Sequence, residues 1–439
     1  MANTYLQRSI SNGNRRTWTW SAWVKRGAIG ATQILADNYT DSNNYAHLYF
    51  SSGNTLNFYS PPAGSWSWHP VYRDTNAWYH IVLRCDTTQG SNGDRLRLYV
   101  NGELAPANAV AGINQNQELN FNASSQLRFG ARQVGSSDYF NGYMSHAHFT
   151  DGYSYAPTEF GQNDTITGQW SIKTSPNVSY GTNGYFILKD GNSVTDQSGE
   201  GNNFTVSGGT LSKTEDNPSN VFATINNLLG SDQIGSTVSF SNGNTVAEDP
   251  NGSASGVNPS FISTLGMPSE GKWYCEVQPS SFSTGSGHSI GIFRSKGDIR
   301  PSSLYSDKVR YIFADTAYYI VKYGSNDQTG LSSVSSGETV GIALDLDNGT
   351  LQYYVNGSAR ANQLTGINSA NDGYEYFFLM DLESSSSGRY GKCSFNFGNG
   401  AFGSTQLTGT TYQDSNGQGI FKYQPPTNFL ALCTKNLNV

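Results

Sequence analysis

Charged side chains are scarce in this sequence. Asp, Glu, Lys and Arg make up 13% of its 439 residues, about half the usual share of a soluble protein, and the formal net charge is −7. Basic residues stand in short, isolated pairs such as Arg15-Arg16. Binding of DNA or RNA needs a Lys/Arg-rich face that displaces counterions, so the sequence argues against a nucleic-acid partner.

Long apolar runs are also missing. None approaches the roughly 20 residues that cross a bilayer, and the first residues lack the apolar stretch of a signal peptide. We therefore expect no membrane insertion and no secretory route. Helical periodicity over ten or more residues is absent as well, which excludes a coiled coil.

Cysteine is rare, with four in the chain. Cys85, Cys275 and Cys393 each continue a pattern of alternating apolar residues, and Cys433 lies in an apolar stretch near the C-terminus. No two have the C-x-x-C spacing of a metal or redox pair. The period of two predicts buried, reduced core thiols of a protein that folds in a reducing cytosol.

Strand-like segments and turn residues fill the chain. Alternating apolar segments such as 18–24, 78–84 and 95–100 are separated by turns rich in Gly, Ser and Asn. Asn101-Gly102 follows a strand directly, as in a tight hairpin, and the pattern of 81–102 recurs at 342–357. We predict an all-β protein of two antiparallel β-sandwiches of the jelly-roll type.

Residues 190–220 have few large apolar side chains, which is typical of a surface connection between domains. We therefore divide the chain into a first sandwich at 1–200, a polar linker at 201–220 and a second sandwich at 221–439.

The motifs themselves resemble known families. The first half is similar to laminin-G-like, concanavalin-A-like lectin domains, and the second half resembles a SPRY domain. The first likeness is carried by W-T-W-S-A-W-V-K-R (18–26), Y-R-D-T-N-A-W-Y-H-I-V-L-R-C-D-T-T (72–88), R-L-Y-V-N-G (97–102) and F-N-G-Y-M-S-H-A-H-F-T-D-G (140–152). The second is carried by G-K-W-Y-C-E-V (271–277), G-I-F (291–293), V-G-I-A-L-D-L-D-N-G-T-L-Q-Y-Y-V-N-G (340–357) and C-S-F-N-F-G (393–398).

The pairing of the two motif sets, with the connection at 216–226 and the terminal F-L-A-L-C-T-K-N-L at 429–437, resembles virion proteins of tailed phages. That resemblance implies binding modules without catalysis. Fold alone does not fix function, so the residues that carry chemistry need their own examination.

Catalytic patterns are missing. Sandwich glycosidases need two carboxylates on one strand face, and no Glu-x-Asp-x-(x)-Glu run occurs. Asp345 and Asp347 come nearest, but they lie where a strand gives way to the Asn348-Gly349 turn, so we expect them to cap that turn. The sequence also lacks G-x-S-x-G, H-E-x-x-H and phosphate-loop motifs. We predict that the protein is not an enzyme.

A metal site has weak support. His146 and His148 lie two apart on an expected strand, with Asp151 as a third possible ligand, but structural histidines are the favoured interpretation of the pair. Laminin-G-like domains often hold calcium at the sandwich rim, so the resemblance leaves calcium open. The loop acids available for it are Asp37, Asp41, Asp94 and Asp138.

Ligand binding is better supported, because aromatic side chains with polar tips are frequent at interfaces. Trp66, Trp68 and Tyr72 lie near Arg73 after a Pro-Pro turn and form one candidate group. The alternative is that this strand simply faces the core.

A second candidate group is Tyr319 and Tyr323, beside the Gly/Ser/Asn loop at 324–330. Neighbouring tyrosines at 318 and 319 point to opposite faces of a strand, so we expect one of them to lie outside the core.

Together these observations predict a non-enzymatic phage virion protein, a tail fibre or surface knob that binds host glycans or other receptors. The expected partners are other virion proteins, a host surface glycan or receptor and further copies of the chain in a homo-oligomer. The expected location is the virion, assembled in the host cytoplasm. Two alternatives stay open: a structural capsid-decoration or tail-assembly protein without a ligand, and a glycan depolymerase.

Overall fold

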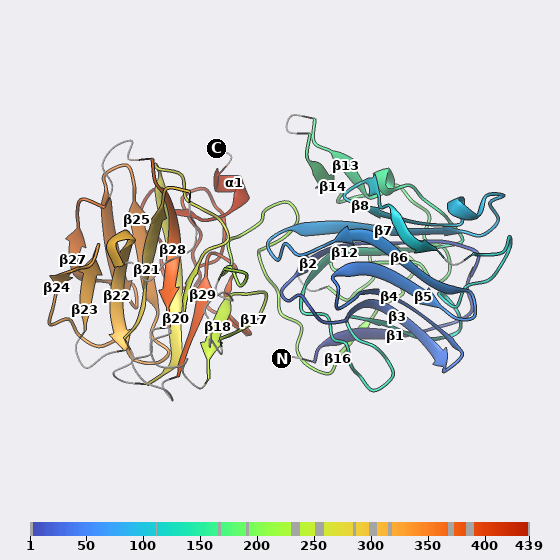
Figure 1. Ribbon diagram of the computed structural model, residues 1–439, viewed down its shortest axis with the longest axis horizontal. Coiled ribbons are helices and arrows are strands. Elements are labelled where there is room, and N and C mark those ends of the chain that lie inside the picture. The colour runs from blue at the N-terminus through green and yellow to red at the C-terminus, as the bar shows by residue number, and fades with distance from the viewer. Residues whose placement is uncertain are drawn as a thin grey trace. The chain divides into compact units, whose positions relative to one another are not determined.

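The computed structural model divides the chain into two compact units, 1–213 and 214–439, and Figure 1 shows the strands of each unit. It describes residues 3–110, 112–165, 168–189, 193–229, 238–250, 259–283, 287–297, 305–314, 318–367, 373–382 and 390–437.

The first unit is a sandwich of two antiparallel sheets. The larger sheet has the strand order β10 (Ala107–Val110), β6 (Gly64–Val71), β5 (Thr55–Ser60), β4 (Asn44–Phe50), β3 (Gln33–Asp41), β11 (Ser125–Phe129), β1 (Tyr5–Ile10) and β16 (Thr205–Ser207). The smaller sheet has the order β15 (Tyr185–Ile187), β12 (Gly142–Asp151), β2 (Thr17–Arg26), β7 (Trp78–Asp86), β8 (Leu96–Val100) and β9 (Glu103–Leu104). A separate hairpin joins β13 (Gly161–Asn163) and β14 (Trp170–Ile172).

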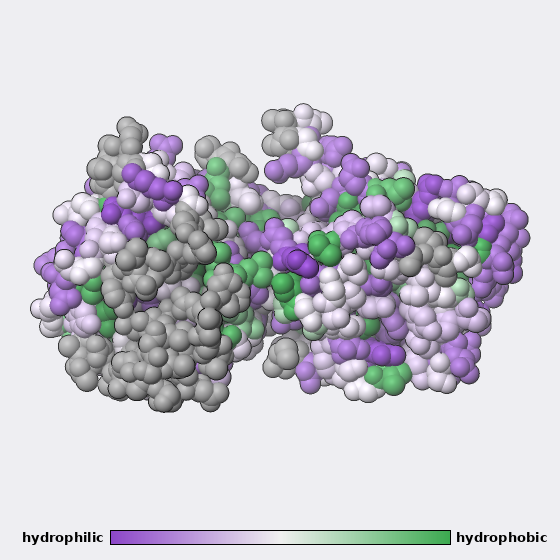
Figure 2. Space-filling model, in the orientation of Figure 1, coloured by the Kyte–Doolittle hydropathy of each residue, from purple (hydrophilic) through white to green (hydrophobic). Residues whose placement is uncertain are grey.

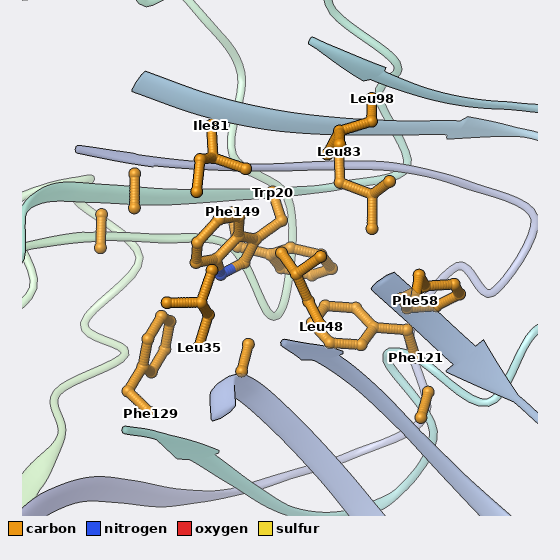
Figure 3. Close-up of a cluster of buried hydrophobic side chains, with 14 of the residues drawn as sticks. Trp20, Leu35, Leu48, Phe58, Ile81, Leu83, Leu98, Phe121, Phe129 and Phe149 are labelled. Carbon is orange, nitrogen blue, oxygen red and sulfur yellow. The ribbon is translucent and has the colours of Figure 1, made fainter. Parts of the chain in front are cut away.

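Alternating side chains build the core of this sandwich. On β2, Trp18 and Trp20 are fully buried and lie opposite Cys85 and Leu83 of β7. Figure 3 shows Trp20 surrounded by apolar side chains from both sheets, among them Leu48 of β4. Because successive side chains on a strand point to opposite faces, every second residue of these strands enters the core.

The second unit is also a sandwich of antiparallel sheets. One sheet has the order β17 (Ser239–Ser241), β18 (Val246–Asp249), β29 (Gly391–Asn396), β20 (Lys272–Phe282), β25 (Val340–Asp345), β26 (Thr350–Val355) and β27 (Ser358–Leu364). The other has the order β19 (Ser260–Ile262), β28 (Glu375–Asp381), β21 (His288–Ser295), β22 (Lys308–Ala314), β23 (Tyr319–Lys322) and β24 (Ser325–Gln328). The remaining elements in the described part of this unit are β30 (Ala401–Phe402), β31 (Thr405–Gln406), β32 (Leu430–Ala431), the 3₁₀ helix η4 (Tyr305–Asp307) and the short helix α1 (Thr434–Leu437).

The C-terminal segment packs on the sheet that contains β20. Its strand β32 pairs in parallel with β20, and Phe421 packs on Tyr274 with ring centroids 5.2 Å apart. Phe421, Ala431 and Cys433 are fully buried and share a small apolar cluster with Tyr274. The last residues described are therefore part of the second unit's packing.

These observations confirm the predicted all-β class. The four cysteines are free and buried, as the alternation predicted. The first unit spans 1–213 and so extends beyond the predicted boundary at residue 200. Strand β16 falls within the predicted linker 201–220, but it pairs with β1 of the first sandwich. Within the described residues, no helix has the length and apolarity needed to span a membrane.

Candidate functional site

A group of tyrosines lies on the face of the larger first-unit sheet that points away from the core. Along β4, Tyr45, His47 and Tyr49 alternate with Leu48 and other core residues. The two tyrosines are half-buried, whereas His47 is 8% exposed. The same alternation that buries one set of side chains presents the other set on the opposite face.

Neighbouring strands complete this group around His47. The His47 ring centroid lies 5.5 Å from that of Tyr45 and 5.0 Å from that of Tyr49. Tyr59 of β5 lies 5.6 Å from His47, and Tyr39 of β3 lies 6.0 Å from Tyr45. We call Tyr39, Tyr45, Tyr49, Tyr59 and His47 the tyrosine platform; its four tyrosines are half-buried.

Small polar residues continue the platform across the sheet. Tyr59 pairs with Ser65 of β6, and Tyr49 pairs with Asn57, which in turn pairs with Ser67. Ser65 is exposed. In Figure 2 the visible surface of the first unit mixes purple, white and scattered green residues.

A buried carboxylate lies beside His47. Asp37 of β3 is 1% exposed, and its Oδ2 accepts the backbone N–H of Gln133 at 2.8 Å. Its Oδ1 is 3.7 Å from Nδ1 of His47. Burial raises the pKa of Asp37 to about 6, against the opposing effects of the Gln133 hydrogen bond, Arg132 and Arg128.

Burial also lowers the pKa of His47 to about 4, with a further contribution from Arg132. His47 is therefore neutral at pH 7, and its contact with Asp37 is not an ion pair despite the short distance.

Two arginines lie near Asp37. Arg128 of β11 pairs with Asp37 in the sheet, and its guanidinium lies 4.4 Å from the ring centre of Tyr5. The side chain of Arg132 is 39% exposed and is 3.9 Å from the carboxylate of Asp138. Arg132 also acts electrostatically on Asp37, on His47 and on the platform tyrosines Tyr45 and Tyr49.

The carboxylate next to the platform is not accessible to a ligand. Hydrolysis of a glycosidic bond needs two carboxyl groups that reach the substrate from opposite sides. Asp37, the carboxylate beside His47, is covered by the backbone at Gln133 and almost fully buried. Half-buried aromatic rings with polar tips provide contact area to a ligand without chemistry.

The structure corrects the first predicted ligand group. Trp66, Trp68 and Tyr72 are 1%, 3% and 7% exposed and belong to the hydrophobic core. Trp66 packs on Phe58, with ring centroids 5.7 Å apart. The side of β6 that carries Trp66 and Trp68 faces inward, and Tyr72, just after β6, is buried as well, so a ligand cannot reach these rings. Arg73 is exposed, but the three aromatic residues predicted to act with it are not.

In the second predicted group, Tyr319 and Tyr323 are both half-buried. The Tyr323 hydroxyl donates a hydrogen bond to the carbonyl of Ile367, and its ring packs 3.9 Å from the guanidinium of Arg294. Tyr323 thus contributes to the packing of the second unit, and a ligand-binding role of this pair stays a prediction.

The predicted metal ligands have structural roles. His148 is buried, shares a hydrogen bond with the Tyr180 hydroxyl (3.0 Å) and stacks on Phe186. Asp151 accepts hydrogen bonds from the backbone N–H of Asn14 and the side chain of Asn122, each at 2.7 Å. His146 lies at a β-bulge, where its φ is 47°.

Across the described part of the chain, no three His, Cys, Asp or Glu side chains are arranged to hold a metal ion. The predicted loop acids serve local contacts. Asp41 caps the turn at Asn43 and Asn44, Asp94 pairs with Arg97 and Asp138 lies near Arg132. Asp345 caps its turn by accepting the backbone N–H of Asn348, as predicted. Asp347 instead accepts the backbone N–H of Gly271, which comes from a distant segment of the chain.

A second buried carboxylate holds the C-terminal segment of the second unit. Glu276 of β20 is fully buried, and its Oε1 accepts the backbone N–H of Tyr423 at 2.7 Å. Its Oε2 accepts the N–H of Lys422 at 2.9 Å and the side-chain amide of Asn396 at 3.0 Å. Burial raises the pKa of Glu276 to about 7, although these hydrogen bonds lower it.

Sequence reasoning missed both the tyrosine platform and Glu276. The platform has a signal in the alternation of Tyr45, His47 and Tyr49 along one strand. Glu276 stands inside the apolar run W-Y-C-E-V at 273–277, where a lone acid predicts a buried carboxylate with hydrogen-bond donors around it.

Comparisons with known proteins fit the fold. Residues 2–158 match the Laminin_G_3 family, described as the concanavalin A-like lectin/glucanases superfamily. A search among curated proteins finds no match for this chain. Over these residues the first unit is similar to concanavalin-A-like lectins, a class that suggests a binding role.

Solved structures with similar folds include SPRY domains. The SPRY domain of human HERC1 is 15% identical, with 39% of this chain and 94% of that chain covered and a TM-score of 0.29. The TRIM65 PSpry domain is 13% identical, with coverages of 40% and 91% and a TM-score of 0.30. The heptameric SAP-like pentraxin from Limulus polyphemus is 15% identical, with coverages of 35% and 72% and a TM-score of 0.28.

Proposed function

We propose that this chain is a non-enzymatic binding protein and that its first unit holds a saccharide on the tyrosine platform. The observation that carries this proposal is the set of four half-buried tyrosines around His47 on the outer face of a lectin-like sheet. Aromatic faces pack against the C–H surfaces of sugar rings, while hydroxyl and amide groups at the rim bind sugar hydroxyls.

The polar groups at the rim favour a saccharide over an apolar ligand. The exposed Ser65 and the half-buried Ser67 follow the platform along the sheet and supply hydroxyl groups. Because the platform is an open sheet face, one site of this kind binds weakly. Several copies in a homo-oligomer would raise the overall affinity, which favours the oligomeric state proposed from the sequence.

We further propose that the protein acts as a host-recognition component of a tailed-phage virion, with other virion proteins as partners. This assignment rests on the pairing of laminin-G-like and SPRY-like motifs in the sequence. The saccharide would then belong to the host surface. A structural decoration protein without a ligand is the main competing function.

The test is a glycan array and a host-cell adsorption assay with the full chain. We expect glycan binding that is lost in the double variant Tyr45→Ala/Tyr59→Ala. The matched control is Tyr153→Ala, because Tyr153 is 43% exposed and stacks on Tyr155 away from the platform residues. Both proteins should keep a cooperative thermal transition.

Two results would contradict the proposal. Absence of binding to any glycan or host cell would favour the structural role. Release of new reducing ends from host polysaccharide would favour the depolymerase.

A further inference from the structure

Positive charge lies beside the tyrosine platform. Arg128 and Arg132 come from β11 and the turn that follows it, and both act electrostatically on Asp37. Arg128 donates hydrogen bonds to the carbonyls of Arg132 and Gln133 and to the side chain of Gln126, which are neutral partners. Its positive charge is therefore not cancelled by these contacts.

The nearby acids balance this charge only in part. Asp37 is 1% exposed, so it is shielded from a ligand on the surface, and burial raises its pKa to about 6. Asp138 is 3.9 Å from Arg132, and both side chains are about one third exposed. An exposed pair at this distance is weak, because water and salt screen it. An anionic group on the ligand can thus compete with Asp138 for Arg132.

The sheet register places these groups in one row. Arg128 pairs with Asp37, Asp37 with His47, and His47 with Tyr59. With strands about 4.8 Å apart, the row from Arg128 to Tyr59 is roughly 14 Å long. A short oligosaccharide that stacks on the tyrosines therefore extends to the arginines.

We infer that the saccharide bound by the platform is anionic, and that Arg132 and Arg128 select its carboxylate or phosphate group. This inference rests on the proposed function. The guanidinium group of Arg presents a planar fork of N–H donors that matches both kinds of anion. The side chain of Arg132 is sufficiently exposed to donate these hydrogen bonds to a ligand.

The experiment is calorimetric titration of the full chain with three probes. They are an oligogalacturonate, which carries carboxylates, its carboxyl-reduced neutral form, and an oligomer of sugars joined by phosphodiesters. We expect at least one of the two acidic probes to bind about tenfold more tightly than the neutral probe. The probe that binds more tightly identifies the anion.

Two variants test the role of the ion pair, with opposite expected signs. Arg132→Gln should reduce the affinity for the acidic probe about tenfold, whereas Asp138→Asn should increase it a few-fold because it removes the competing acid. The matched controls are Arg97→Gln and Asp94→Asn, which change another ion pair of the first unit and should leave binding unchanged.

The outcomes separate this inference from the proposed function. Equal affinity for acidic and neutral probes, lost in Tyr45→Ala/Tyr59→Ala, would overturn the anionic selection and keep the platform. Equal effects of Arg132→Gln and Arg97→Gln would also overturn it. No tyrosine-dependent binding of any probe would overturn both.

Discussion

Replacement of Glu276 by glutamine should change how the stability of the protein depends on pH. The carboxyl group is fully buried, and burial raises its pKa from 4.5 to about 7 in the folded protein. The folded state therefore keeps the proton at pH values where the unfolded chain has lost it. The stabilising effect is complete below pH 4.5 and is lost as the pH rises to 7.

The size of the effect follows from the two pKa values. They differ by about 2.5, and each pKa unit corresponds to about 1.4 kcal/mol, so Glu276 lowers the free energy of unfolding by up to about 3 kcal/mol between pH 4.5 and pH 8. Glutamine does not titrate. The free energy of unfolding of Glu276→Gln, measured relative to that of the wild type, should therefore increase by about 3 kcal/mol as the pH rises from 4.5 to 8.

Chemical denaturation at pH 4.5, 6 and 8 measures this difference. The control is Glu248→Gln, which removes a partly exposed carboxyl group paired with Lys392 at 2.9 Å and leaves Glu276 in place, so the loss of stability caused by Glu276 should remain. Parallel profiles for Glu276→Gln and the wild type would refute the reasoning. They would mean that Glu276 is ionised in the folded protein at acid pH despite its burial.

Three further predictions follow from the first unit. Trp68→Ala should lower the free energy of unfolding by roughly 3–5 kcal/mol because Trp68 lies in the core, whereas Tyr45→Ala should lower it by about 1 kcal/mol. Equal losses in chemical denaturation would contradict the assignment of Trp68 to the core and of Tyr45 to the outer face. Affinity for an acidic saccharide should rise as the pH falls from 7 to 5, because Asp37 takes up a proton while His47, with a pKa of about 4, stays neutral. The charged and titratable groups that face Asp37 are His47, Arg128, Arg132 and Asp138. Asp37→Asn should abolish this dependence, and the same pH profile in that variant would exclude Asp37 as its source. Finally, EDTA should leave the melting temperature and glycan binding unchanged, because the acids proposed for calcium are engaged in local contacts. A melting temperature that falls with EDTA and returns when calcium is added would contradict this prediction.

Local sequence patterns predicted much of the fold. Asn101-Gly102 and Asn356-Gly357 take positive φ angles, as tight hairpin turns require. Cys85 and Cys393 are buried on strands whose alternation was visible in the sequence. These features depend on residues close together in the chain, so they can be recognised without the structure.

The face on which an aromatic side chain lies was harder to predict. The period of two shows that Trp66 and Trp68 share one side of a strand, and that Tyr45 and Tyr49 share one side of another. It does not show which side the second sheet covers. The β6 pair faces the core and the β4 pair faces outward, a result that depends on contacts between distant strands.

The charges around Asp37 were unpredictable for a similar reason. Asp37 and Gln133 are 96 residues apart, and only strand pairing brings β3 beside β11 and the turn that carries Arg132. The sequence marked Asp37 as a loop acid for calcium. In the structure it is a strand residue, buried beneath the backbone that follows β11.

The most direct test of the binding site is a crystal structure of the chain with an oligosaccharide selected on the glycan array. We predict a sugar ring stacked on Tyr45 and Tyr59 above His47. A saccharide held elsewhere, with the four tyrosines bare, would contradict the account.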